Sequence, residues 1–182
     1  MNEYEKLCHI LNDQFLSTSQ DKMEETKGCL KPQRVSIDNG NKTIDRTLYR
    51  FNFDDFDFLP FLNKKETRPE GLRKFCDYIL IAKYQEKTYV LLIELKRGGG
   101  AGASLQLNAS KIFLNYLFQT AERLATDFAD TPFDTKKVKV RKIVVKEIKS
   151  NKQLTQIDRN FNKNQDPILY KSSGQFLLSS FL

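Results

Sequence analysis

The segment between residues 75 and 96 constrains the fold of this chain more than any other part of the sequence. Two runs rich in β-branched, aromatic and aliphatic residues, 75–84 and 88–96, flank the polar stretch Gln85-Glu86-Lys87. This pattern predicts a β-hairpin. The second arm is apolar almost throughout, which is typical of a central strand buried on both faces of its sheet.

Two charged residues close this apolar strand. Glu94 and Lys96 lie on the same face of the predicted strand because side chains alternate, and Leu95 points to the other face. If the turn is centred near residues 85–86, Asp77 lies across from residue 94 or 95, and directly opposed Cβ atoms are about 4.5–5.5 Å apart. We therefore expect two carboxylates and an ammonium group to converge at one point.

Asp77 and Glu94 would repel each other unless a cation or a proton lies between them. Mg²⁺ suits them because it takes oxygen ligands, and the backbone carbonyl of Leu95 could add another. Such a metal polarises a phosphate oxygen and lowers the pKa of an attacking water. Lys96 would orient or deprotonate that water, or neutralise charge that develops on the phosphorane. The alternative is an ordinary salt bridge at the end of a surface hairpin.

Residue types that other hydrolases use are scarce. His9 is the only histidine, which excludes paired-histidine nucleases, zinc hydrolases with several histidine ligands and most Ser-His-Asp sites. Cys8, Cys29 and Cys76 form no CxxC pair and indicate neither a disulfide framework nor a zinc site. Any hydrolysis must therefore depend on carboxylates, lysine and a hard metal ion.

The whole sequence predicts one mixed α/β domain over residues 1–182. The expected elements outside the hairpin are a helix over 2–16, a loop over 17–32, strands over 34–38 and 47–53 separated by the turn Asp38-Asn39-Gly40, a helix over 103–128 and a strand over 139–148. Near one side of the second helix fall Leu105, Ile112, Tyr116 and Leu124. Because strands and helices do not alternate regularly, we expect an α+β arrangement with a mixed sheet.

Three short motifs carry a family resemblance. They are Cys76-Asp77-Tyr78, then Ile93-Glu94-Leu95-Lys96 about seventeen residues on, and a following helix that contains Gln106. This pattern resembles the PD-(D/E)xK nuclease superfamily over roughly residues 1–150. The family has the restriction-endonuclease-like fold, whose core is a helix, a three-strand meander, a helix and a further strand.

The resemblance implies a role for each matching residue. Asp77 takes the place of the metal-binding aspartate, and Glu94 and Lys96 take the place of the (D/E)xK pair. Gln106 occupies the place of a glutamine found in several branches, where it would position a phosphate or water. Cys76 replaces the proline that often precedes the aspartate. Many members also carry an acid on the first helix, and here either Glu3 or Glu5 could serve.

The function implied by the resemblance is hydrolysis of phosphodiester bonds with Mg²⁺ or Mn²⁺. We expect nucleic acid as the substrate, DNA rather than RNA, and by analogy a role in restriction or phage defence. A homodimer is expected because double-strand cutting generally needs two active sites. One alternative is a module of the same fold that binds nucleic acid or a protein without cleaving. Another is a nucleotide-cofactor domain, because Gly98, Gly100 and Ala103 fit GxGxxA after a strand.

The formal charge of +7 favours a polyanionic partner. From Lys136 to Lys163, ten Lys and Arg residues stand against two acids, which indicates either a nucleic-acid surface or a solvated strand face. Asp54, Asp55 and Asp57 form either a turn or a source of one metal ligand. No apolar run reaches the roughly 20 residues that span a bilayer, and the N-terminus lacks a secretory h-region. A cytoplasmic protein without a membrane partner is therefore expected.

Overall fold

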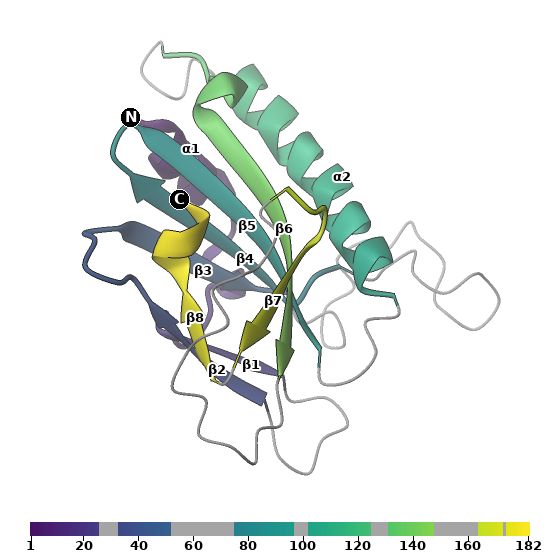
Figure 1. Ribbon diagram of the computed structural model, residues 1–182. Helices are drawn as coiled ribbons and strands as arrows, with labels where there is room; N and C mark the ends of the chain where they lie inside the picture. The colour runs from purple at the N-terminus through teal and green to yellow at the C-terminus, as the bar shows by residue number, and fades with distance from the viewer. Residues whose placement is uncertain (26–32, 52–74, 97–101, 125–130, 148–163, 173) are drawn as a thin grey trace, which may run out of the picture.

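The computed structural model describes residues 1–25, 33–51, 75–96, 102–124, 131–147, 164–172 and 174–182 (Figure 1). In these ranges the helices are α1 (Glu3–Ile10) and α2 (Ala103–Arg123), with the short 3-10 turns η1 (Asp13–Phe15), η4 (Thr135–Lys137) and η5 (Leu178–Phe181). Both helices pack on one face of a five-stranded mixed sheet, and a three-stranded mixed sheet packs on its other face. The prediction of a mixed α/β structure is therefore confirmed.

A five-stranded sheet forms the centre of the described structure. Its strand order is β3 (Asp45–Arg50), β4 (Tyr78–Tyr84), β5 (Lys87–Lys96), β6 (Val138–Glu147) and β7 (Ile168–Ser172). The first three strands pair antiparallel, and β5, β6 and β7 pair in parallel. The carboxyl ends of these three parallel strands therefore meet at one edge of the sheet, which is the lower edge in Figure 1.

A smaller sheet joins three segments that are far apart in the sequence. It has the order β1 (Lys22–Glu25), β2 (Gln33–Asp38) and β8 (Gln175–Leu177). β1 pairs antiparallel with β2, and β8 pairs with β2 in parallel. The C-terminal segment is thereby tied to the N-terminal third of the chain.

The hairpin of β4 and β5 matches the sequence prediction. Tyr84 pairs with Lys87, which leaves a two-residue turn. Gln85 in that turn has a φ of 54°, and short hairpin turns of the preferred types need a positive φ at a central position. β5 is the middle strand of the sheet and is buried from Thr88 to Leu95. The prediction of a central strand buried on both faces is confirmed.

The alternating side chains of β5 enter two separate hydrophobic cores. Val90 and Leu92 belong to the core that lies between the large sheet and the helices. Leu91, Ile93 and Leu95 belong to the core between the large sheet and the small one. Glu94 and Lys96, which alternate with Leu95, therefore lie on the helix side of the sheet.

The N-terminal segment differs from the prediction in two places. α1 ends at Ile10 because Leu11 is extended and the Asn12 side chain accepts a hydrogen bond from the backbone N–H of Gln14, which begins η1. The predicted helix over 2–16 is therefore too long. The predicted loop over 17–32 contains β1, whose Glu24 backbone exchanges hydrogen bonds of 2.8 and 3.0 Å with the Tyr78 hydroxyl.

The other predicted elements are present with shifted ends. β2 and β3 correspond to the strands expected over 34–38 and 47–53, and the turn between them has Gly40 at a φ of 63°. α2 corresponds to the helix expected over 103–128 and is described as far as Leu124. Among the residues that the structure places, no helix has both the length and the apolar character needed to cross a membrane.

Candidate active site

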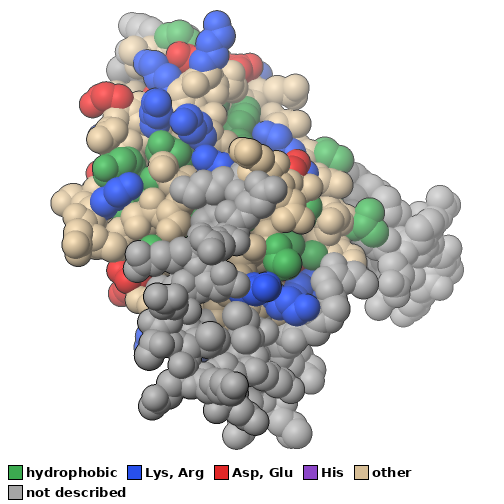
Figure 2. Space-filling model, viewed as in Figure 1, with side chains coloured by type: hydrophobic (Ala, Val, Ile, Leu, Met, Phe, Trp, Pro, Cys, Tyr) green, Lys and Arg blue, Asp and Glu red, His purple; other side chains and the backbone are tan. Residues whose placement is uncertain are grey.

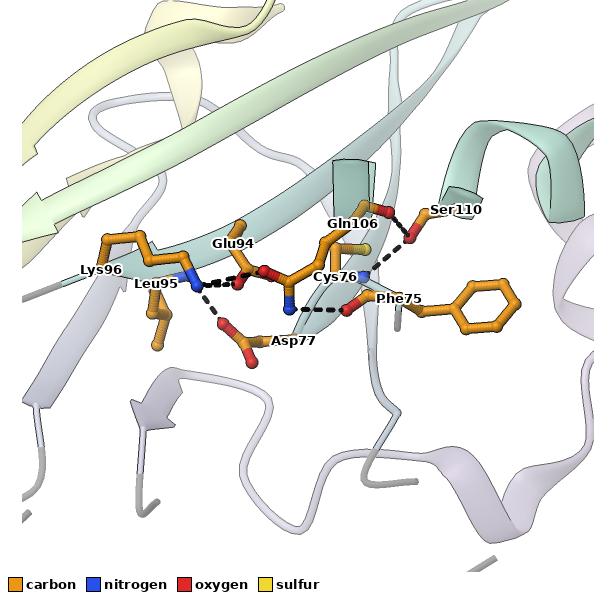
Figure 3. Close-up of polar contacts among 8 residues, drawn as sticks. All are labelled: Phe75, Cys76, Asp77, Glu94, Leu95, Lys96, Gln106 and Ser110. Carbon is orange, nitrogen blue, oxygen red and sulfur yellow. Dashed lines mark hydrogen bonds and ion pairs between the residues drawn. The ribbon is translucent and has the colours of Figure 1, made fainter. Parts of the chain in front are cut away.

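The β4–β5 hairpin brings Asp77 to the end of β5. Tyr78 pairs with Ile93, so the preceding residue Asp77 reaches the level of Glu94. Oδ2 of Asp77 accepts a hydrogen bond of 2.7 Å from the backbone N–H of Leu95. Figure 3 shows that the carboxylates of Asp77 and Glu94 lie close to the same point. The register predicted from the turn is therefore correct.

Glu94 is a buried acid with one oxygen that lacks a partner. The residue is 1% exposed. Its Oε1 lies 2.5 Å from Nζ of Lys96, whereas Oε2 is buried without any hydrogen-bond partner among the described residues. Burial and the charge of Asp77 raise the pKa of Glu94 to about 7, although the nearby charge of Lys96 acts to lower this pKa. A buried acceptor left unsatisfied is costly, so a proton or a cation at this oxygen would stabilise the folded protein.

Without metal, the raised pKa of Glu94 makes the free energy of unfolding depend on pH. The pKa of about 7 in the folded protein exceeds the ordinary value of 4.5 for this side chain. The stabilising contribution of the protonated acid is therefore complete below pH 4.5 and is lost as the pH rises through 7. The full effect is at most about 3 kcal/mol. In EDTA, we expect Glu94→Gln to gain stability relative to the wild type between roughly pH 5 and pH 8, as measured by urea unfolding.

The control for this prediction is Glu86→Gln. Glu86 is an exposed acid in the turn of the same hairpin, so its replacement should leave the pH dependence of unfolding unchanged. A stability difference between the wild type and Glu94→Gln that stays constant over the whole pH range would contradict the raised pKa of Glu94.

Lys96 is held in place by two neighbours. Besides Glu94, its Nζ donates a hydrogen bond of 3.1 Å to Oε1 of Gln106. The amide nitrogen of Gln106 in turn donates to the backbone carbonyl of Phe75 at 3.4 Å. The Lys96 side chain keeps 21% of its surface exposed. The ammonium group is therefore oriented by α2 and β5 together (Figure 3), and the Lys96 side chain is not fully buried.

Ser110 supports the site and was not predicted from the sequence. Its Oγ accepts a hydrogen bond of 2.7 Å from the backbone N–H of Cys76 and donates one of 2.9 Å to the carbonyl of Gln106. These bonds fix the residue before Asp77 to α2. Cys76 is fully buried, and this burial raises the pKa of its thiol to about 12, as is typical of a structural cysteine. The only sequence signal for Ser110 is a small polar residue four positions after Gln106.

Ser110→Ala should destabilise the protein by about 1–3 kcal/mol, because the buried N–H of Cys76 would then have no acceptor. Thr120→Ala is the matched control, since the Thr120 hydroxyl makes the same type of bond within α2, to the carbonyl of Tyr116 at 2.9 Å, but on an exposed part of the helix. Urea unfolding of both variants measures the difference. Equal destabilisation of the two variants would show that the hydrogen bond between Ser110 and Cys76 does not anchor the site.

Several acids considered from the sequence do not join the described site. Glu5 closes the capping box of α1 with Asn2, and Glu3 forms an ion pair with Lys6. Within the described ranges, no group of three or more His, Cys, Asp and Glu side chains is placed to hold a metal. The described carboxylates at the site are thus Asp77 and Glu94. Some further candidates lie outside the described residues: Asp54, Asp55, Asp57, Gly98 and Gly100.

The described basic residues of the segment 136–163 do not form one surface, because they lie on both faces of β6. Residues 148–163 lie outside the described structure. Lys139 pairs with Tyr89 and Arg141 with Leu91, near the start of β5 and on its other face. These two residues are therefore remote from the carboxylates. By contrast, Lys146 pairs with Lys96 and lies beside the site.

Comparisons with models of protein families, with characterised proteins and with solved structures gave no match to this chain. The functional argument therefore depends on the geometry of its own residues.

Proposed function

We propose that this protein is a metal-dependent nuclease of the PD-(D/E)xK superfamily that hydrolyses phosphodiester bonds in DNA. The observation that carries the proposal is the buried Glu94 carboxylate beside Asp77 and Lys96, because its Oε2 has no hydrogen-bond partner among the described residues. The order of α1, the β3–β4–β5 meander, α2 and β6 also supports it, because this is the order of the restriction-endonuclease-like core.

The donors at the site fit a hard divalent cation. Asp77 and Glu94 offer carboxylate oxygens, and Leu95 offers a backbone carbonyl at the same strand end. Oxygen ligands of this kind are those that Mg²⁺ and Mn²⁺ prefer. When bound, the metal would supply a more acidic water and would polarise the phosphate. The mutual repulsion of the two carboxylates would then be relieved.

Lys96 would act on the nucleophile and on the developing negative charge. Its ammonium group is oriented by Glu94 and Gln106, so it would offer an N–H donor in a fixed position beside the two carboxylates. A donor that is already in position costs no reorganisation during the reaction, which is the condition for efficient electrostatic stabilisation. Gln106 has a positioning role in this scheme, because it acts through Lys96.

The rival proposal is a module of the same fold that binds nucleic acid or a protein without cleaving it. Incubation with single-stranded and double-stranded DNA and RNA, in Mg²⁺, Mn²⁺ or EDTA, distinguishes the two. We expect metal-dependent cleavage of DNA that EDTA abolishes. Binding without cleavage in either metal would favour the rival. Cutting of both strands would require two sites, so we include a homodimer in the proposal, which light scattering of the eluted protein tests.

A further inference from the structure

Three lysines form a row across the parallel half of the large sheet. Lys96 of β5 pairs with Lys146 of β6, and Lys146 pairs with Lys171 of β7. Residues that pair directly in parallel strands point to the same face, so all three lie on the helix side with Glu94. Neighbouring strands are about 4.8 Å apart, which gives the row a length of about 10 Å. It begins at Lys96 and leads away from the carboxylates.

The row is distinct from another lysine of the same face. Lys142 is held at the start of the row's face by Asp166 and Asn108, because its Nζ lies 2.9 Å from Oδ2 of Asp166 and 2.9 Å from Oδ1 of Asn108. Lys146 is half-buried and Lys171 is exposed. The row is thus open to solvent at its outer end.

The row is separate from a second basic region near the opposite end of β6. Figure 2 shows Lys and Arg side chains low in the centre, where β6 and β7 approach their carboxyl ends, and a larger group at the upper left, where β5 and β6 begin. The exposed residues Lys137 and Lys139 lie at the beginning of β6, at the end of the strand opposite Lys146. The two regions therefore provide charge-matched variants.

We propose that Lys146 and Lys171 continue the active site from Lys96 and bind the phosphates next to the cleaved one on the same nucleic-acid strand. This inference rests on the proposed nuclease function. Successive phosphates follow one another along a DNA strand, and the long, flexible side chains of lysines in a row of about 10 Å can reach more than one of them. Lysine amines act as point charges toward such phosphates. The cleaved strand would then cross the carboxyl ends of β5, β6 and β7 in that order.

The test measures binding without cleavage. Affinity for a fluorescent DNA duplex of roughly 20 base pairs is measured in EDTA over a series of salt concentrations. On duplex DNA, each phosphate that a lysine neutralises adds about 0.9 to the steepness of log K against log salt, so Lys146→Ala/Lys171→Ala should lower this slope by about 1.8. Lys137→Ala/Lys139→Ala, which removes the same charge, should leave the slope unchanged. Lys146→Gln/Lys171→Gln keeps most of each side chain and should behave like the alanine pair.

Each outcome decides the inference. If the salt slope of the Lys146 and Lys171 variants equals that of the wild type, these two lysines do not bind phosphates. The same conclusion follows if Lys137→Ala/Lys139→Ala lowers the salt slope by the same amount. If the wild type still cleaves DNA with metal in that case, the proposed nuclease function is kept and only the phosphate-binding role of Lys146 and Lys171 is rejected. A wild type that binds no nucleic acid overturns both.

A second measurement locates the contact on the substrate. A neutral methylphosphonate one or two positions from the cleaved bond removes the charge that the row would bind. It should weaken binding of the wild type but weaken binding of Lys146→Ala/Lys171→Ala little further, because the two changes remove the same interaction. Fully additive effects would show that these lysines contact other phosphates.

Discussion

Lys96→Ala should lower the rate of DNA cleavage by about 100-fold or more, as expected when a positioned catalytic group is removed. The affinity for DNA should change much less, because Lys96 is one charge among those available to the phosphates. The physical reason is its fixed position: Glu94 at 2.5 Å and Gln106 at 3.1 Å orient its ammonium group before the substrate arrives. Single-turnover cleavage with saturating Mg²⁺, together with binding in EDTA, separates the two effects.

Lys87→Ala is the matched control for this variant. Lys87 and Lys96 are the first and last residues of β5, and Lys87 is exposed at the hairpin turn. Its replacement should leave the cleavage rate unchanged. Cleavage by Lys96→Ala at the wild-type rate would show that the active site lies elsewhere.

Mg²⁺ or Mn²⁺ should raise the melting temperature of the wild type, and Glu94→Gln should remove most of this response. At about ten times the dissociation constant, a ligand that binds only the folded state stabilises it by roughly 1.4 kcal/mol. For a chain of this length, that corresponds to a rise of about 3–6 °C. Because the neutral amide replaces a buried acid that Asp77 repels, metal-free Glu94→Gln should be at least as stable as the wild type near neutral pH.

Thermal melts in Mn²⁺ and in EDTA measure this response, with Glu86→Gln as the control that keeps it. Glu94→Gln should also abolish cleavage activity. An ordinary salt bridge between Glu94 and Lys96 makes the opposite prediction for stability. A wild type that is indifferent to metal, together with a clearly destabilised Glu94→Gln, would exclude the metal site.

Local sequence signals were sufficient for the hairpin and for Asp77, Glu94 and Lys96 at its open end, whereas Gln106 was indicated only by the family resemblance. The turn at Gln85 sets the register of β4 and β5, because only two residues connect the paired strands. Once this register is set, alternation alone brings Asp77 level with Glu94 and places Glu94 and Lys96 on one face. The following helix then brings Gln106 to Lys96. The steps within the hairpin depend on short spacings that can be counted along the chain.

The exposed side of α2 was decided by tertiary packing. Leu105, Ile112 and Tyr116 fall near one side of this helix, yet they are 65%, 72% and 63% exposed. A different side is buried against the large sheet, and it includes Leu107, Leu114 and Leu117. Both sides carry large apolar residues, so helical periodicity does not select between them. The contacts of α2 with β5, β6 and α1 determine which side is buried.

The small sheet and the row of lysines likewise could not be predicted from the sequence. Met23 is fully buried only because β1 pairs with β2, and β2 gains β8 from the C-terminal end of the chain. Lys96, Lys146 and Lys171 become neighbours through parallel pairing across connections of many residues. No short turn sets the register of such strands, so sequence spacing does not predict which residues pair. The sequence thus determined the hairpin and the charged residues at its end, and only the tertiary structure decided what surrounds them.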